Sequence, residues 1–178
     1  KHRKQLQKLS YKNFYLTDSF ISKKIDNIRY EITNTKNTNK KEKLKILHIT
    51  NFNERHNGRL FFNTGRRINN GFIRLNHSVL TISDRDIQSY YRSIIDFDGS
   101  KKLNTKLIDT ISNYIPDLIV LGHADLINLS TLKFIKFYYP EIKIMQWFLD
   151  KMTEEWVKNK NRFNNKISIM DCSFCTTS

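Results

Sequence analysis

Cysteine is scarce in this 178-residue sequence, which contains only Cys172 and Cys175. So few thiols fit a protein of the reducing cytoplasm. The pair forms a C-x-x-C motif, but a zinc site needs a second pair of ligands, and none accompanies it. Residues three apart in a strand point to opposite faces, so we expect two small buried side chains. The sequence therefore predicts no metal site.

Glycine-rich phosphate-binding motifs are also lacking, since the chain has only five glycines. A dinucleotide fingerprint needs G-x-G-x-x-G directly after the first strand, and Gly58, Gly65 and Gly71 are too widely spaced for it. The absence of G-x-x-x-x-G-K-[ST] argues against a P-loop nucleotidase. A nicotinamide oxidoreductase remains a weak alternative, because Asp84 stands where a ribose-binding acid is expected.

No apolar run approaches the ~18–20 residues that a membrane-spanning helix requires. The first residues are charged and no apolar stretch follows them, so a signal peptide is not indicated. We therefore expect a cytoplasmic protein, with peripheral contact at a membrane as an open alternative. The chain starts without methionine and stops inside an expected strand, so we expect it to be a piece of a longer protein.

Acidic residues are few, with 17 Asp and Glu against 31 Lys and Arg, a net charge of +14. Residues 1–43 hold 12 cationic and 4 acidic side chains, and residues 44–178 hold 19 and 13. A surplus of this kind attracts nucleic acid or an anionic membrane surface. A general Lys, Asn and Ile bias of the source proteome explains it equally well.

The basic first part of the chain has a helical pattern. Ile21, Ile25, Ile28 and Ile32 recur at helical spacing, which predicts an amphipathic arm over residues 1–33. Docking of this arm on the rest of the protein is the first interpretation, and binding to a membrane surface is the second. Residues 34–43 lack apolar residues and predict a linker.

Beyond residue 43, short apolar runs alternate with segments of helical periodicity. Strands are expected over residues 44–50, 77–83, 117–122, 143–149 and 167–176. Helices are expected from near Leu60 to Leu75 and over residues 104–114, 128–138 and 154–164. Uniformly apolar strands in such alternation indicate a parallel sheet covered on both faces. The sequence therefore predicts a Rossmann-like, doubly wound α/β domain over residues 44–178.

Charged and polar residues collect where the expected strands end, while the opposite strand ends resemble ordinary turns. Ligands of such sheets bind beyond the carboxyl ends of the strands. The candidate substrate-binding residues are Glu54, Arg55, His56, Asn57, Gly58, Arg59, Asp84, Asp86 and Asp150.

The segment after the first strand is expected to form one wall of a ligand cleft. Gly58 lets the backbone turn closely, and the amides that open the next helix favour an anion, with Arg59 adding charge. Gly65 and Gly71 lie inside that helix, where we expect them to allow close packing on the sheet.

His123 and Asp125 follow the third strand and are the candidate catalytic residues. A histidine there can act as a general base, and a carboxylate can orient it or activate a hydroxyl. A lone loop histidine is more often structural, and His56 with Glu54 is a competing pair.

Three segments resemble the amino-terminal domain of bacterial GT-B glycosyltransferases, in the group related to spore-maturation-type glycosyltransferase-like proteins. They are NFNERHNGRLFFNTGRRINNGFIRLNHSVLTISDRDI (51–87), PDLIVLGHADLI (116–127) and KIMQWFLD (143–150). The resemblance implies two Rossmann-like domains facing each other across a cleft. It also implies a metal-independent enzyme without a cofactor, whose donor substrate is a nucleotide-sugar and whose acceptor is a hydroxyl.

The resemblance also suggests roles for particular residues. Asn57, Gly58 and Arg59 match the loop that approaches the donor phosphates and the acceptor. His123 and Asp125 match a loop that lines the cleft, and Asp150, named above, matches its rim. The second domain is missing, so the resemblance implies an acceptor-side domain that is inactive alone.

The expected function is thus part of a glycosyltransferase that moves a sugar from a nucleotide-sugar to a hydroxyl. An alternative from another class is a non-catalytic module whose basic arm binds an anionic polymer or a membrane surface. Nucleic acid is not the expected partner.

Overall fold

The computed structural model describes residue 25 and residues 43–94, 96–152 and 154–176. Contacts divide the chain into two units, Lys1–Glu42 and Lys43–Ser178. Apart from Ile25, which is helical, the expected arm and most of the expected linker lie outside the described residues.

Five parallel strands form one sheet in the order β2-β1-β3-β4-β5. Their bounds are β1 Lys45–Thr50, β2 Ser78–Ser83, β3 Leu118–Gly122, β4 Lys143–Phe148 and β5 Cys172–Cys175. Helices cover the sheet, so the predicted Rossmann-like, doubly wound α/β fold is confirmed.

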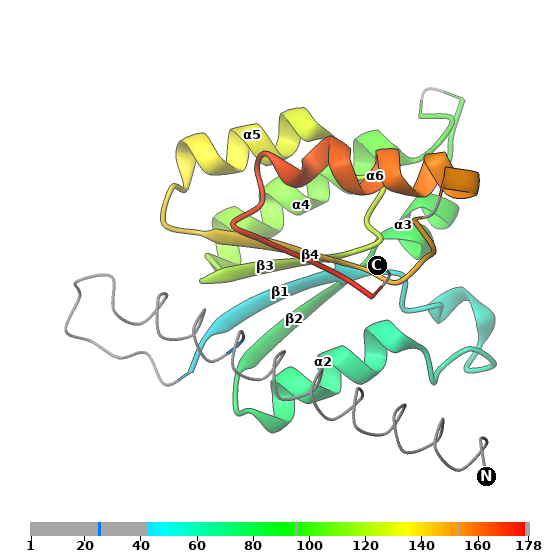
Figure 1. Ribbon diagram of the computed structural model, residues 1–178. Helices are drawn as coiled ribbons and strands as arrows, with labels where there is room; N and C mark the ends of the chain where they lie inside the picture. The colour runs from blue at the N-terminus through cyan, green and yellow to red at the C-terminus, as the bar shows by residue number, and fades with distance from the viewer. Residues whose placement is uncertain (1–24, 26–42, 95, 153, 177–178) are drawn as a thin grey trace, which may run out of the picture. The chain divides into compact units, whose positions relative to one another are not determined.

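The connections are α-helices with two short 3-10 segments. Their bounds are η1 Glu54–His56, α2 Thr64–Arg74, α3 Asp84–Tyr91, α4 Ser100–Tyr114, α5 Leu129–Tyr138, η2 Glu154–Trp156 and α6 Val157–Ile167. The chain passes from β1 to β2 in one direction along the sheet and to β3, β4 and β5 in the other. Right-handed crossovers then put α2 on one face and α4, α5 and α6 on the other, as Figure 1 shows.

Side chains on both faces of the central strands are buried, which explains why these strands are almost uniformly apolar. Leu47 and Ile119 point to one face, where α4 and α5 contribute Leu107 and Ile135 to the larger core cluster. Each of these side chains is fully buried, and such burial contributes about 1.5–3 kcal/mol per side chain.

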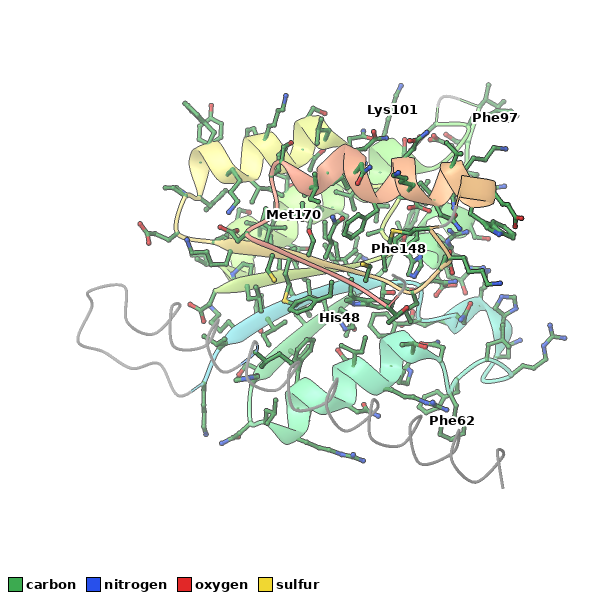
Figure 2. The ribbon with its side chains drawn as sticks, viewed as in Figure 1. His48, Phe62, Phe97, Lys101, Phe148 and Met170 are labelled. Atoms are coloured by element: carbon green, nitrogen blue, oxygen red, sulfur yellow. The ribbon has the colours of Figure 1, made fainter. Side chains whose placement is uncertain are left out.

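The opposite face holds a smaller cluster under α2, built on Ile46, Val120 and Trp147. His48 is fully buried beside it and is labelled in Figure 2. Its Nδ1 lies 3.3 Å from Oδ1 of Asn69 on α2. Burial lowers the pKa of His48 to about 4, with a smaller opposing effect from Asn69. His48 is therefore a neutral core residue that joins β1 to α2.

The helix after β1 starts later than the sequence suggested. We expected it from near Leu60, but α2 begins at Thr64. Asn63 caps it, since its side-chain oxygen accepts a hydrogen bond from the Arg66 amide at 2.9 Å. Before this cap, Asn57 and Gly58 both have positive φ, and no helix continues through such residues.

One helix was missed. No helix was expected between the strand ending at residue 83 and the helix over residues 104–114, whereas Asp84 opens the eight-residue helix α3. Two acidic residues in the first turn favour a helix start, but Ile87 is the only apolar residue of α3 that is buried. A single buried position gives no periodic stripe from which to predict a helix.

Other boundaries differ by a few residues. Helix α4 begins at Ser100, four residues before the expected start, and α6 runs to Ile167, so β5 is only the four residues Cys172–Cys175. The two cysteines form no disulfide, and Cys175 is exposed, so the expectation of two buried thiols is wrong.

Candidate functional site

The strand order reverses between β1 and β3, so the loops that follow them diverge at the carboxyl edge of the sheet. Two glycines permit close packing there. A Cβ on Gly65 would lie 2.6 Å from Thr50 Cγ2, and one on Gly122 would lie 2.1 Å from the Trp147 ring. The expectation of close helix–sheet packing is confirmed for Gly65 and wrong for Gly71, which has no atom near its Cβ position.

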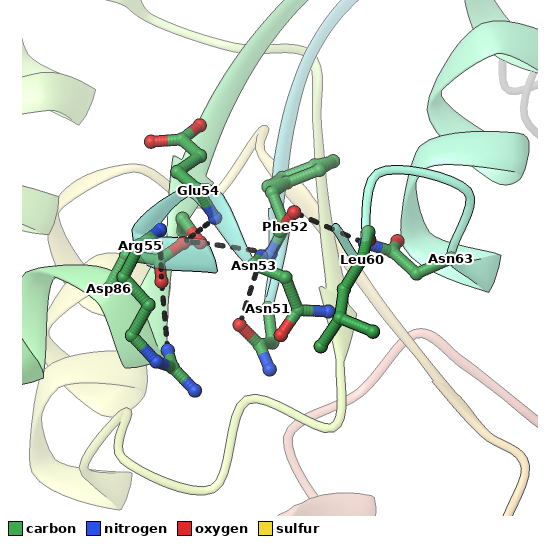
Figure 3. A network of polar contacts seen from close by, with 9 residues as sticks. Asn51, Phe52, Asn53, Glu54, Arg55, Leu60, Asn63 and Asp86 are labelled. Atoms are coloured by element: carbon green, nitrogen blue, oxygen red, sulfur yellow. Dashed lines mark hydrogen bonds and ion pairs between the residues drawn. The ribbon is translucent and has the colours of Figure 1, made fainter. Parts of the chain in front are cut away.

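Asp86 organises the loop after β1, as Figure 3 shows. One carboxylate oxygen accepts a hydrogen bond from the Glu54 amide at 2.8 Å, and the other accepts from the Arg55 guanidinium at 2.8 Å. The Arg55 amide and the Ser83 hydroxyl also donate to this carboxylate. Burial would raise the pKa of Asp86, but these hydrogen bonds outweigh burial and hold it below the ordinary value.

Two predicted substrate-binding residues, Arg55 and Asp86, are thus bound to each other. Asp86 is only 1% exposed, and its bonds to Arg55 and to the backbone amide of Glu54 tie η1 to the start of α3. The sequence did not indicate these structural contacts. The side chain of Glu54 is exposed, and its binding role remains a prediction. Asn57, Gly58 and Arg59 are exposed, and His56 is half-buried. A binding role for these four residues remains a prediction.

A small cavity, open to solvent, lies at the carboxyl ends of β3 and β4 beneath α6. Its lining consists of Leu121, His123, Ala124, Asp125, Gln146, Trp147, Phe148, Arg162 and Lys166. The structure therefore brings the two predicted catalytic residues together at one cavity. No residue of the 51–72 segment lines it, so that segment is not a wall of this cavity.

His123 holds two loops together. Its Nε2 accepts a hydrogen bond from the Leu149 amide at 3.0 Å, so the ring proton is on Nδ1, which lies 3.5 Å from Asp150 Oδ2. The ring also packs against Phe148, with centroids 4.2 Å apart. Burial lowers the pKa of His123, against the opposing charges of Asp150 and Asp125. Because Nε2 is engaged, the geometry gives His123 a positioning role, and its catalytic role remains a prediction.

Asp125 forms ion pairs with two arginines, and both N···O distances are longer than those of a strong ion pair. Its Oδ2 lies 3.4 Å from Arg85 and 3.7 Å from Arg162, and both guanidinium side chains are nearly half exposed. Charge-assisted N–H···O bonds are usually about 2.7–2.9 Å long. Lys166 extends from α6 and donates a hydrogen bond to the carbonyl of Ala124.

Asp84 lies beside this cluster and is only 1% exposed. Neither carboxylate oxygen has a hydrogen-bond partner of ordinary geometry among the described residues. Burial raises the pKa of Asp84 to about 6, while the Arg85 amide and the charges of Arg85 and Lys166 oppose the rise. Burial likewise lowers the pKa of Lys166, against the attraction of Asp125 and Asp84. Asp84 was expected at the rim, but it is a buried neighbour of the cavity.

Sequence reasoning missed the cations of α6. Arg162 and Lys166 lie in VKNKNRFNNKI, a stretch with four cations and no acidic residue. The absence of acidic residues beside four cations indicated a cationic helix. The apolar residues of this helix are too few to predict which side faces the sheet. Among the described residues, no group of three His, Cys, Asp or Glu side chains could hold a metal ion. Within the same residues, no helix is long and apolar enough to cross a membrane.

Comparisons with known proteins identify no family for this chain. No family matches the sequence, and no curated protein matches it. Among solved structures, the chain is similar to NtrX from Brucella abortus in complex with ADP, with a TM-score of 0.44 and 14% identity. The match covers 75% of this chain and 23% of that chain, so the chain spans about a quarter of NtrX.

The expectation of a glycosyltransferase function is corrected here. No family and no curated protein supports a glycosyltransferase assignment, and that prediction is withdrawn. The resemblance to GT-B domains is tested by none of the comparisons and remains a prediction. The weakness of the match means that no activity is transferred from NtrX to this chain.

Proposed function

We propose that residues 43–178 form a domain that binds a small molecule through an anionic group, a phosphate or a carboxylate, at the carboxyl ends of β3 and β4. The observation that supports it is the loose sharing of one carboxylate by two arginines at the mouth of a cavity. Asp125 lies 3.4 Å from Arg85 and 3.7 Å from Arg162.

Loosely held guanidinium groups favour an incoming anion. Arginine binds phosphate and carboxylate through two parallel hydrogen bonds, which are shorter and stronger than these contacts. Half-exposed ion pairs contribute only ~0–1 kcal/mol, so breaking those of Asp125 costs little. Arg85 and Arg162 can therefore turn towards a ligand while Asp125 accepts hydrogen bonds from its hydroxyl or amine groups.

The charge balance around the cavity changes with pH. Arg85, Arg162 and Lys166 supply three cations, and Asp125, Asp84 and Asp150, which lies beside His123, supply three carboxylates. Asp84 takes up a proton near pH 6 because burial raises its pKa to about 6. Cations then outnumber carboxylates, so we expect anion affinity to rise as the pH falls through this value.

The size and place of the cavity define the ligand further. Parallel α/β sheets bind ligands beyond the carboxyl ends of their strands, which is where this cavity opens. The cavity is far smaller than the ~300–1,000 Å³ of sites that enclose a drug-sized molecule. The cavity therefore suits the anionic end of a ligand. The nucleotide-sugar and hydroxyl acceptor expected from the sequence remain untested predictions.

The test measures binding of inorganic phosphate, pyrophosphate and citrate by calorimetry at constant ionic strength. Arg162→Gln and Arg85→Gln should each weaken binding of the best probe by about tenfold or more, because each removes a charged hydrogen-bond donor. Arg67→Gln on α2, an equal change on the opposite face of the sheet, is the matched control. Binding that is absent for all three anions, or equal in all variants, contradicts the proposal.

A further inference from the structure

Strand β2 is an edge of the sheet, because among the described residues it pairs with β1 alone (Figure 1). The Ser78 amide donates to the Leu44 carbonyl at 2.9 Å, on the β1 side. Backbone groups alternate in direction along a strand, so those of Val79 and Thr81 point away from β1. In the part of the chain that the structure describes, neither residue has a hydrogen bond on that outer side. The edge therefore presents unpaired N–H and C=O groups at two alternate positions.

The edge of β2 lacks the features that usually prevent pairing with another strand. Such edges are protected by charged side chains, proline or bulges, or they are very short. The six residues of β2, SVLTIS, include no charge and no proline, and their register with β1 runs unbroken from Ser78 to Ser83. The other edge strand of the sheet, β5, has only four residues. The two edges thus differ, and β2 is the one suited to accept another strand.

The side chains of β2 show which part of the strand is accessible. Ser78, Leu80 and Thr81 are exposed, and Leu80 has 38% of its surface in solvent. Ile82 and Ser83, which follow them, are buried. The accessible part is therefore residues 78–81, where one leucine lies among uncharged residues.

We infer that β2 is a dimer interface, at which a second copy of this chain adds its own β2 in antiparallel orientation. The two-fold axis passes at Leu80. Val79 of each chain then lies opposite Thr81 of the other, and each such pair exchanges two N–H···O bonds. Leu80 lies opposite its own copy in the non-hydrogen-bonded position, where side chains approach each other most closely. The two sheets become one continuous sheet across the axis.

Self-complementarity identifies the partner as a second copy. In a two-fold interface the same surface patch is used by both chains, so a charged residue near the axis meets its own copy. Like charges that face each other across a strand pair destabilise it, and β2 has none. The pairing also covers the exposed part of Leu80 with an identical apolar side chain. A foreign strand would gain the backbone hydrogen bonds, but no side chain of β2 selects one.

Sedimentation equilibrium of the full chain, from micromolar to millimolar concentration, tests for the dimer. The buffer contains about 0.3 M NaCl, which screens the repulsion that the net charge of +14 causes between copies. The mass should rise from that of one chain towards that of two and should not exceed it, because a two-fold interface is closed.

Two matched pairs of variants locate the interface. Thr81→Lys puts a charge at the edge of β2, and Asn165→Lys puts the same charge at an exposed position of α6, which connects β4 to β5 at the far end of the sheet. Thr81→Lys should raise the dimer dissociation constant at least about tenfold, and the control should stay within about twofold. Leu80→Ser should raise it about tenfold, whereas Leu129→Ser on α5, where the leucine is also 38% exposed, should not. Thermal unfolding of the dilute chains checks that each variant folds.

Amide hydrogen exchange then tests the pairing residue by residue. In the dimer the Val79 and Thr81 amides become hydrogen-bonded, so raising the protein concentration should slow their exchange at least about tenfold. The Leu80 amide points to β1 in both states, so its exchange should change much less. An interface on a helix, or one made by residues 1–43, does not produce this alternation along β2.

Three outcomes overturn the inference. The first is a chain that stays monomeric up to millimolar concentration. The second is a dimer that Thr81→Lys and Asn165→Lys weaken equally, or not at all. The third is a dimer in which the exchange of the Val79 and Thr81 amides is unchanged. The interface lies at β2 and the cavity at β3 and β4, so a failure of phosphate binding leaves these results unaffected.

Discussion

Replacing Asp84 by asparagine should stabilise the fold, and the gain should grow with pH. The side chain is 1% exposed, and neither carboxylate oxygen has a hydrogen-bond partner of ordinary geometry among the described residues. Burial raises its pKa from 3.8 to about 6. At about 1.4 kcal/mol per pH unit, that rise means the ionised form costs the folded protein about 3 kcal/mol.

The sign follows from proton linkage. The folded protein holds the Asp84 proton more tightly than the unfolded chain, so below pH 3.8 the carboxyl is neutral in both states and costs nothing. The cost appears as the pH rises from 3.8 and is complete above about 6. Asparagine is never charged, so Asp84→Asn removes a penalty that grows by about 1.4 kcal/mol between about pH 5 and about pH 7.5.

Urea unfolding, followed by tryptophan fluorescence at those two pH values, measures the effect. The difference in free energy of unfolding between the variant and the unaltered chain is taken at each pH, and the two differences are compared. This comparison cancels any change in hydrogen bonding that does not depend on pH. Asp109→Asn, an equivalent change at an exposed position of α4, controls for loss of a negative charge. A stability difference for Asp84→Asn that is the same at both pH values refutes the reasoning.

Three further changes test the fold around the site. Gly65→Ala should destabilise the fold by about 1–3 kcal/mol, because the new Cβ would lie 2.6 Å from Thr50 Cγ2. Gly71→Ala in the same helix should stabilise the fold by about 1 kcal/mol, because no atom lies near its Cβ position. Urea unfolding that ranks the two variants the other way contradicts the packing. Ile115→Gly should raise the melting temperature, since isoleucine at φ 47 costs about 1–2 kcal/mol. A lower melting temperature would show that the contacts of its exposed side chain contribute more to stability. Asp86→Ala should cost at least about 1.5–3 kcal/mol and make the η1 loop more sensitive to protease, because buried donors lose a charged acceptor; unchanged cleavage would mean the loop does not depend on this carboxylate.

The sheet was predictable because each central strand is an unbroken apolar run in the sequence. Side chains such as Ile46 and Leu47 are buried on opposite faces of the same strand, so the strand appears as an unbroken apolar run. The alternation of these runs with helical segments then determined a parallel arrangement. Helix α3 gave no such signal, since Ile87 alone of its apolar residues is buried.

The site was only partly predictable, for a different reason. His123 and Asp125 were identified because position after a parallel strand places a residue at the carboxyl edge. Asp86 follows the same rule, yet its carboxylate accepts hydrogen bonds from two backbone amides that precede it by 31 and 32 residues. No local sequence pattern reveals this pairing. Arg162 was missed because it reaches the cavity from the last helix, and the face of that helix is set by packing.

The most direct test of the central claim is an NMR titration of the full chain with inorganic phosphate, observed through the backbone amides. Anion binding at the proposed place predicts saturable shifts of one common affinity at residues 123–125 and 149–150 and on the inner side of α6. In Arg85→Gln these shifts should require about tenfold more phosphate. Shifts that spread over the exposed lysines without saturating, or that centre on residues 57–65, would contradict the account.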